Sequence, residues 1–287
     1  IGAVTVNGGT LGATLNIDGY TSLSSGTANM TIGSGGNDRS VVTFSTNATL
    51  AKLLVGTTKG GSGAVIQNGG NLTVGAHINN TDVLSIGTGG GYGYYRMNKG
   101  SLITGQLGLT GSGAGNNDGV FDLYEGSVGV VTNGWLIWGW AGGNGVFNVF
   151  NGSLASPKSG NDLTFAYAAS RDTFAMLNLI GPAAFVDSTG YNTGKSINMA
   201  RNPGNLAGVL NLNAGTLLAN RVFAGVTGTP TLFNFGGGKL QVNASTTYAA
   251  TFMQGLTAAT VYPGGAVIDT TNVNVTLNQP LLAPVGY

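Results

Sequence analysis

The 287-residue chain contains no cysteine and one histidine, and only 7% of its residues are charged. Average soluble domains have about 25% charged residues. With 11 basic and 10 acidic side chains, the chain has neither the basic patch that holds a nucleic acid nor an acidic tail. Because cysteine is absent, disulfides and cysteine-ligated zinc are excluded. This composition suits an extracellular protein without disulfides, although cytosolic proteins can also lack cysteine. We expect no nucleic-acid partner.

Long hydrophobic runs are also missing, since no segment approaches the roughly 18 apolar residues of a membrane-spanning helix. The chain does not open with a basic and then apolar export signal. Glycine is abundant instead, at 52 residues. Glycine inside a helix costs about 1 kcal/mol relative to alanine, and no window has a helical apolar period. We therefore expect an all-β fold and no membrane insertion.

A nine-residue pattern recurs along the chain: two apolar residues, a polar one, an apolar one, two free positions, glycine, a small polar residue and an apolar one. The glycine position, which Pro182 occupies once, recurs every 23 to 33 residues. A second short alternating run follows most copies, so each unit holds about three strands. The copies begin at Ala64, Tyr94, Val120, Val146, Val209 and Leu232, with a degraded copy at Met176.

Two architectures fit such repeats: a β-solenoid, or a propeller whose blades need four strands and about 40 residues. The shorter repeat favours the solenoid. We predict a right-handed parallel β-solenoid (β-helix) of about nine to eleven coils, with roughly three short strands per coil. Residues 1–247 are expected to form one continuous domain of repeats. Residues 248–287, where the pattern changes, are expected to form an atypical C-terminal cap.

Equivalent positions of successive repeats stack in a solenoid, about 4.8 Å apart. One predicted core column comprises Val65, Tyr95, Phe121, Phe147, Leu177, Leu210 and Phe233. A second lies two residues further on, at Met97, Leu123, Val149, Leu179, Leu212 and Phe235. Between the columns runs a polar row, which we interpret as a stacked hydrogen-bonded ladder; binding of a cation or of sugar hydroxyls is the alternative. This row comprises Asp122, Asn148, Asn178, Asn211 and Asn234.

Towards the C-terminus, a run of segments is similar to a known family. They are Phe233–Val242, Thr251–Leu256, Gly264–Thr270, Val273–Leu277 and Gln279–Leu282. Residues 209–282 resemble most specifically the C-terminal part of bacterial autotransporter-associated β-strand repeat proteins. The resemblance implies an exported surface or matrix component of a bacterium, with no assigned activity and no catalytic residues to transfer.

Groups that could perform catalysis are sparse. The tightest acidic cluster is Asp118, Asp122 and Glu125, and Asn117-Asp118-Gly119 is typical of a turn. We favour a structural role for these acids over a calcium site. A β-helical polysaccharide lyase or hydrolase needs several acids, or calcium with a base, in one cleft. We therefore predict a protein that is not an enzyme and has no cofactor or metal; a carbohydrate-binding or carbohydrate-active β-helix is the alternative.

Three tryptophans, Trp135, Trp138 and Trp140, lie within six residues. If this segment is a strand, Trp138 and Trp140 share one face and Trp135 lies opposite. Such aromatic residues fill a core, form a subunit contact or stack on sugar rings. All three interpretations stay open at this point.

The first segment, with Ile1, Val4 and Val6, alternates apolar and small residues and has no charge before Asp18. It is typical of an available edge strand. We expect residues 1 to about 17 to pair with a neighbouring copy, in open head-to-tail homopolymers. The favoured function is a non-enzymatic structural subunit of a bacterial cell-surface layer or extracellular fibre. Its expected partners are other copies of itself and, as a second candidate, extracellular polysaccharide.

Overall fold

The structure, a computed structural model, describes residues 4–18, 23–24, 29–75, 83–111, 116–131, 134–140, 142–155, 162–165, 167, 172–190, 196–204 and 206–285. These residues form 31 short strands and two 3-10 helices, Gly9–Leu11 and Ala249–Thr251. Across the described ranges, we find no helix of the length and apolarity that crossing a membrane requires.

The strands build three sheets, A, B and C, in which every pairing is parallel. Sheet A consists, in order, of β1 (Val4–Val6), β4 (Asn29–Ile32), β7 (Lys52–Val55), β10 (Leu84–Ile86), β13 (Leu107–Leu109), β16 (Leu136–Trp138), β19 (Leu163–Phe165), β22 (Ile197–Asn198), β25 (Val222–Phe223) and β28 (Met253–Gln254). Sheet B consists of β2 (Ala13–Ile17), β5 (Arg39–Phe44), β8 (Ser62–Gln67), β11 (Tyr92–Met97), β14 (Asn117–Leu123), β17 (Gly143–Val149), β20 (Thr173–Leu179), β23 (Leu206–Leu212), β26 (Thr231–Phe235), β29 (Ala258–Val261) and β31 (Leu281–Leu282). Sheet C consists of β3 (Leu23–Ser24), β6 (Ala48–Leu50), β9 (Asn71–Val74), β12 (Ser101–Thr104), β15 (Ser127–Val130), β18 (Ser153–Ala155), β21 (Phe185–Asp187), β24 (Thr216–Ala219), β27 (Lys239–Val242) and β30 (Val267–Asp269).

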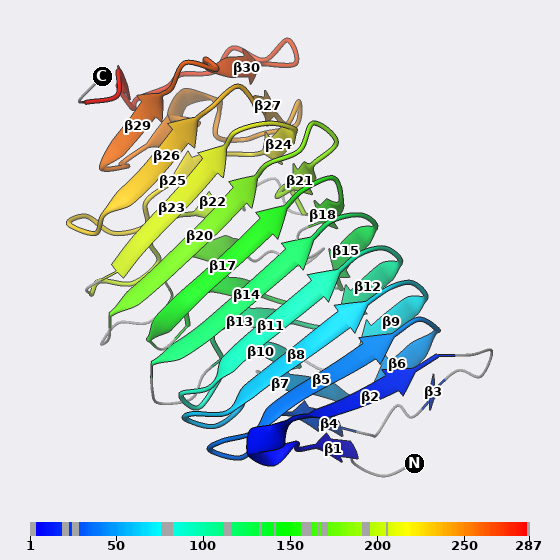
Figure 1. Cartoon of the computed structure of the whole chain (residues 1–287). Helices are drawn as coiled ribbons and strands as arrows, with labels where there is room; N and C mark the ends of the chain where they lie inside the picture. Colours follow the sequence, from blue (N-terminus) through cyan, green and yellow to red (C-terminus); the bar gives the residue numbers. More distant parts are fainter. Residues whose placement is uncertain are drawn as a thin grey trace.

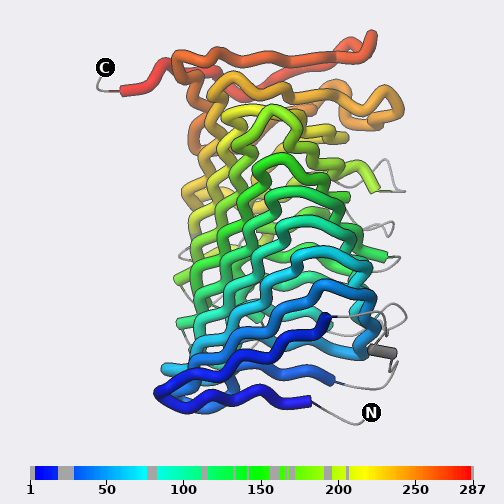
Figure 2. Tube along the Cα trace, turned by 45° about the vertical axis from the view of Figure 1, so that its right-hand side comes forward, coloured from blue at the N-terminus to red at the C-terminus, as the bar shows by residue number. Residues whose placement is uncertain are grey.

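Each coil contributes one strand to each sheet, and β1 to β30 form ten such triplets. The strands of sheet B run from lower left to upper right in Figure 1 while the chain climbs from β2 to β29, which makes the coil right-handed. Figure 2 shows the same stack, with the N-terminus and the C-terminus at opposite ends. The predicted right-handed parallel β-solenoid with three strands per coil is therefore confirmed.

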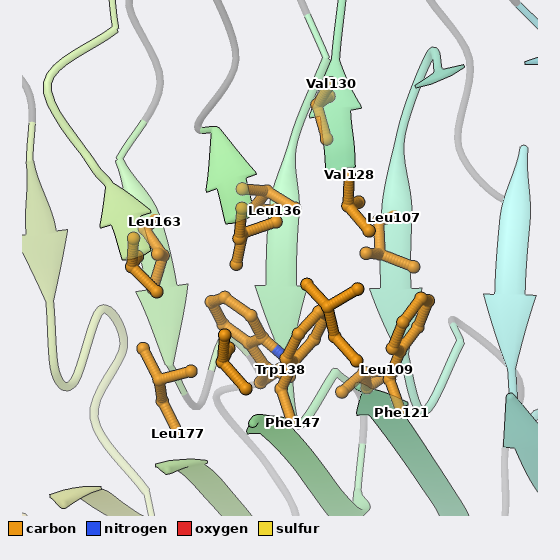
Figure 3. Packing of buried hydrophobic residues seen from close by; sticks show 14 of the residues in the cluster. Leu107, Leu109, Phe121, Val128, Val130, Leu136, Trp138, Phe147, Leu163 and Leu177 are labelled. Carbon is orange, nitrogen blue, oxygen red and sulfur yellow. The ribbon is translucent and has the colours of Figure 1, made fainter. Parts of the chain in front are cut away.

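The core lies between the sheets and repeats from coil to coil. The strand register aligns Tyr95, Phe121 and Phe147, as predicted, and all three side chains are fully buried. Their rings stack in parallel, with centroids 4.6 Å apart for Tyr95–Phe121 and 4.5 Å for Phe121–Phe147. In Figure 3, Trp138 of sheet A points toward Phe147 of sheet B across this core. The distance between stacked rings thus follows from the spacing between adjacent coils.

The corner between sheets A and B requires glycine. Gly56 and Gly87 directly follow strands of sheet A and have φ angles of 66° and 73°. A Cβ at Gly56 would clash with the carbonyl oxygen of Tyr92, and one at Gly87 with that of Asp118. Glycine adopts this conformation without strain, and it therefore allows the chain to turn sharply into sheet B at these positions. Thr110 occupies the same place in the next coil with φ of 64°, and its Oγ1 accepts a hydrogen bond from the Trp140 N–H (2.8 Å).

One polar side chain, Gln67, occupies a core position that is apolar in the neighbouring coils. Tyr95 donates its hydroxyl proton to Gln67 Oε1 (2.7 Å), and Gln67 Nε2 donates to the carbonyl of Ser101 (2.9 Å). These bonds offset the cost of burying an amide and a phenol. Burial raises the pKa of Tyr95 above its ordinary value, so the phenol is the neutral donor of the pair.

The two ends of the solenoid differ. Residues 248–269, within the region expected to form a cap, add the coil β28–β29–β30. The chain then crosses the end of the stack (Figures 1 and 2), where Val273, Val275 and Leu277 pack against the core. At the other end, β1 and β2 have a described neighbour on one side only. The inward side chains of β2, Leu15 and Ile17 among them, are consequently only partly buried.

We predict that Phe147→Ala lowers the free energy of unfolding by about 3–5 kcal/mol, because it leaves a cavity between two stacked coils. Phe150→Ala is the matched control. Phe150 is half-buried and stacks on Tyr124 at 4.3 Å on the outer surface, so we expect a loss of about 1 kcal/mol. Guanidinium unfolding followed by circular dichroism measures both. Equal losses would contradict the role of the Phe147 column.

Candidate functional site

The outer face of sheet B carries the polar row that the sequence singles out. Asn148 Nδ2 donates to Asp122 Oδ1 (2.7 Å), Asn178 Nδ2 to Asn148 Oδ1 (2.6 Å), Asn211 Nδ2 to Asn178 Oδ1 (2.6 Å), and Asn234 Nδ2 to Asn211 Oδ1 (2.7 Å). All five side chains are half-buried. The row is thus a continuous chain of side-chain hydrogen bonds across five coils, with one proton on each amide nitrogen directed elsewhere.

The carboxylate of Asp122 anchors one end of this ladder. A carboxylate only accepts hydrogen bonds, so every amide in the row must donate toward the N-terminal coil. The other oxygen, Asp122 Oδ2, accepts the hydroxyl proton of Tyr94 (2.8 Å). Burial and, second, this hydrogen bond raise the pKa of Tyr94 above its ordinary value. Both carboxylate oxygens are therefore used within the protein.

A second outer row lies at the beginning of the sheet B strands, where the sequence indicated a turn at Asp118. That interpretation was wrong, because Asp118 lies inside β14 and pairs in register with Asn144 of β17. Asn144 Nδ2 donates to Asp118 Oδ1 (2.7 Å). Pairing with the neighbouring coil extends the strand through a segment whose local sequence favours a turn. One feature of the sequence indicates this pairing: Asp118 and Asn144 each stand four residues before a ladder residue, so they occupy equivalent positions of successive repeats.

Trp138 belongs to the core. It is 1% exposed, its ring meets Phe147 edge to face with centroids 5.6 Å apart, and it also contacts Phe165 at 5.3 Å. Among the interpretations for the tryptophans, core filling therefore describes Trp138.

Trp140 does not share a face with Trp138, so the expected arrangement was wrong. The strand β16 ends at Trp138, and Gly139 has a φ angle of 70°, which redirects the chain. Trp135 and Trp140 are instead half-buried and each contacts the ring of Tyr167 edge to face, with centroids 5.6 and 5.7 Å from it. The guanidinium of Arg201 covers Trp135 at 4.7 Å. Trp135 and Trp140 therefore belong to a half-buried aromatic cluster with Tyr167 that is separate from the core position of Trp138.

The predicted inter-subunit strand is partly described. Ile1 lies outside the described residues. Val4 and Val6 belong to β1, in register with Met30 and Ile32 of β4. Val4 is half-buried, whereas Val6 is 8% exposed. Both side chains complete the first coil, while the other edge of β1 has no partner among the described residues.

Acidic and basic groups are dispersed over the described part of the chain. There, no three His, Cys, Asp or Glu side chains gather closely enough to hold a metal ion. Two ion pairs join described residues, Arg201–Asp162 at 4.0 Å and Lys239–Asp269 at 3.5 Å. Glu125 is exposed, and Asp118 and Asp122 separately accept hydrogen bonds from asparagines. The side chains of the described outer surface can therefore form hydrogen bonds, through the asparagine and aspartate rows, and aromatic contacts, through the cluster around Tyr167.

Comparison with known proteins finds no family model that matches the chain, and no curated protein or solved structure that is similar to it. The arguments on function therefore rest on the residues and geometry described above.

We predict that Asn178→Ala, which removes two ladder hydrogen bonds, destabilises the protein by about 1–3 kcal/mol. Thr43→Ala is the control, since Thr43 lies in the same outer row, beyond the ladder. We expect it to cost under about 0.5 kcal/mol. Thermal unfolding measures both variants, and an Asn178→Ala protein as stable as the wild type would show that the ladder contributes nothing to stability.

Proposed function

We propose that the protein is a non-enzymatic structural β-solenoid, a subunit of a bacterial cell-surface layer or extracellular fibre that associates head to tail. One observation carries the proposal: the repeated positions are used for stacking one coil on the next. Backbone hydrogen bonds, core rings and the asparagine ladder all run along the rod axis. Such a quasi-one-dimensional stack suits a rigid element that transmits force or sets a spacing.

The ends of the rod suggest how copies associate. At one end, β1 and β2 present strand edges with no described partner, above a partly covered apolar core. At the other, β30 has β27 as its one partner among the described strands, and its Val267 is 47% exposed. Unpaired parallel edges accept a further strand through main-chain hydrogen bonds. In the proposed assembly, the N-terminal coil of one copy packs on the C-terminal end of the next, where β30 offers an edge of sheet C that has no described partner.

Surface location is part of the same proposal. The low charge of the chain, 7% of residues with a net charge of +1, weakens the repulsion that keeps proteins apart. The likeness to autotransporter-associated repeat proteins implies export from a bacterial cell. Partners in this setting are other copies of the protein and extracellular polysaccharide.

Sedimentation velocity over a concentration series tests the association. We expect the 287-residue chain to form species that grow beyond dimers as concentration rises. The double variant Thr5→Lys/Thr14→Lys places charges on the exposed outer faces of β1 and β2 and should remain monomeric. Thr73→Lys is the matched control, because it puts the same side chain on β9, which is paired on both sides; it should assemble like the wild type.

Three outcomes would contradict the proposal. A wild-type chain that stays monomeric at high concentration would exclude self-association. A double lysine variant that assembles normally would exclude the β1–β2 edge. Growth that stops at a dimer would indicate a closed two-fold contact in place of a head-to-tail fibre.

A further inference from the structure

A groove of about 650 Å³ runs along the outer side of the molecule where the sheet B strands begin. Its lining comes from five successive coils, those of β14, β17, β20, β23 and β26. Four spacings between coils of about 4.8 Å give it a length of about 19 Å. The lining includes Asp118, Asn144, Asp172, Phe174, Ala207 and Pro230.

The strand register orders these residues along the rod. Asp118, Asn144, Phe174 and Ala207 are paired in sequence on successive strands, so they form one row parallel to the axis. Polar groups therefore occupy the N-terminal half of the row, and an aromatic ring and a methyl group the C-terminal half. A ligand that follows the row must be elongated and must present both kinds of surface.

Hydrogen-bonding capacity remains in the polar half. Asn144 uses one amide proton on Asp118 Oδ1 at 2.7 Å. The second amide proton, the Asn144 carbonyl oxygen and Asp118 Oδ2 make no further hydrogen bond within the described residues. An amide beside a carboxylate thus offers a donor and strong acceptors side by side, which matches adjacent hydroxyl groups.

Charge narrows the ligand class. Asp118 and Asp172 are both acidic, and no lysine or arginine lines the described part of the groove. Acidic chains are repelled from such a surface. The half-buried Phe174 ring offers an apolar platform of the kind on which the C–H face of a sugar ring packs.

We propose that this groove binds an uncharged, linear oligosaccharide that lies along the rod axis. Asp118 and Asn144 hydrogen-bond to its hydroxyl groups, and Phe174 stacks on a neighbouring ring. A pyranose ring is about as long as the ~4.8 Å between coils, so successive sugars meet successive strands. The site does not depend on the proposed head-to-tail assembly, because Asp118, Asn144 and Phe174 lie on the fifth, sixth and seventh of the ten coils.

Titration calorimetry tests this with cellohexaose, xylohexaose, mannohexaose, chitohexaose and laminarihexaose as neutral probes, and hexagalacturonate as the acidic one. We expect at least one neutral hexasaccharide to bind the wild-type chain and hexagalacturonate not to bind. Phe174→Ala and Asp118→Asn should each weaken the affinity for that sugar by about tenfold or more. Circular dichroism verifies that both variants remain folded.

Phe185→Ala is the matched control. Phe185 lies on β21 of sheet C and is 36% exposed, so its loss removes an outer phenylalanine away from the groove residues. We expect this variant to bind within about twofold of the wild type.

The proposal is overturned if no neutral hexasaccharide binds at millimolar concentration, or if hexagalacturonate binds more tightly than the neutral sugars. It is also overturned if folded Phe174→Ala and Asp118→Asn proteins bind like the wild type, since the sugar then lies elsewhere. Binding of a lysine hexapeptide in place of the sugars would assign the groove to cationic peptides. Each of these results leaves the sedimentation test of the assembly unaffected.

Discussion

Parallel strand pairing between successive coils is the constraint on which the rest of this molecule depends. Each coil places its backbone about 4.8 Å above the previous one, in register. Residues at equivalent positions are therefore forced into contact, whatever their chemistry. The rings of Tyr95, Phe121 and Phe147 stack because this spacing suits parallel aromatic faces. The same spacing brings asparagines to 2.6–2.7 Å from one another on the outer face.

The inner and outer faces of sheet B use this constraint differently. On the inner face, a buried polar side chain is costly unless it is hydrogen-bonded. Gln67 meets this requirement through its hydrogen bonds with Tyr95 and with the carbonyl of Ser101. Outside, amides and carboxylates stay half-exposed and keep part of their hydrogen-bonding capacity. In the asparagine ladder, the side chains form hydrogen bonds with one another along the rod axis, and these bonds support its rigidity. The row through Asp118 and Asn144 keeps more of it facing solvent, where a groove provides room for a ligand.

A structural rod and a sugar-binding groove are compatible roles. The proposed assembly would use the strand edges at the ends of the stack, whereas the groove lies on the flank of the fifth to ninth coils. A filament built from such subunits would repeat the groove along its length. Weak sites repeated in this way gain avidity for a long polymer, because each further contact is intramolecular. The aromatic cluster of Trp135, Trp140 and Tyr167 provides a separate outer surface.

The sequence by itself determined the solenoid, its core columns and the polar row from Asp122 to Asn234. These follow from alternation within strands and from a repeat that recurs along the chain, and both are local properties of the sequence. Only the tertiary structure decided that Asp118 is in a strand, that Trp135 and Trp140 contact the same ring, and that Phe174 continues the row of Asn144. The placement of Asp118 and of Phe174 depends on pairing between coils, because a neighbouring strand can override a local turn preference. The placement of Trp140 depends on the backbone conformation of Gly139, which redirects the chain. Turns of unequal length separate these residues, so their alignment follows from the register of the sheet.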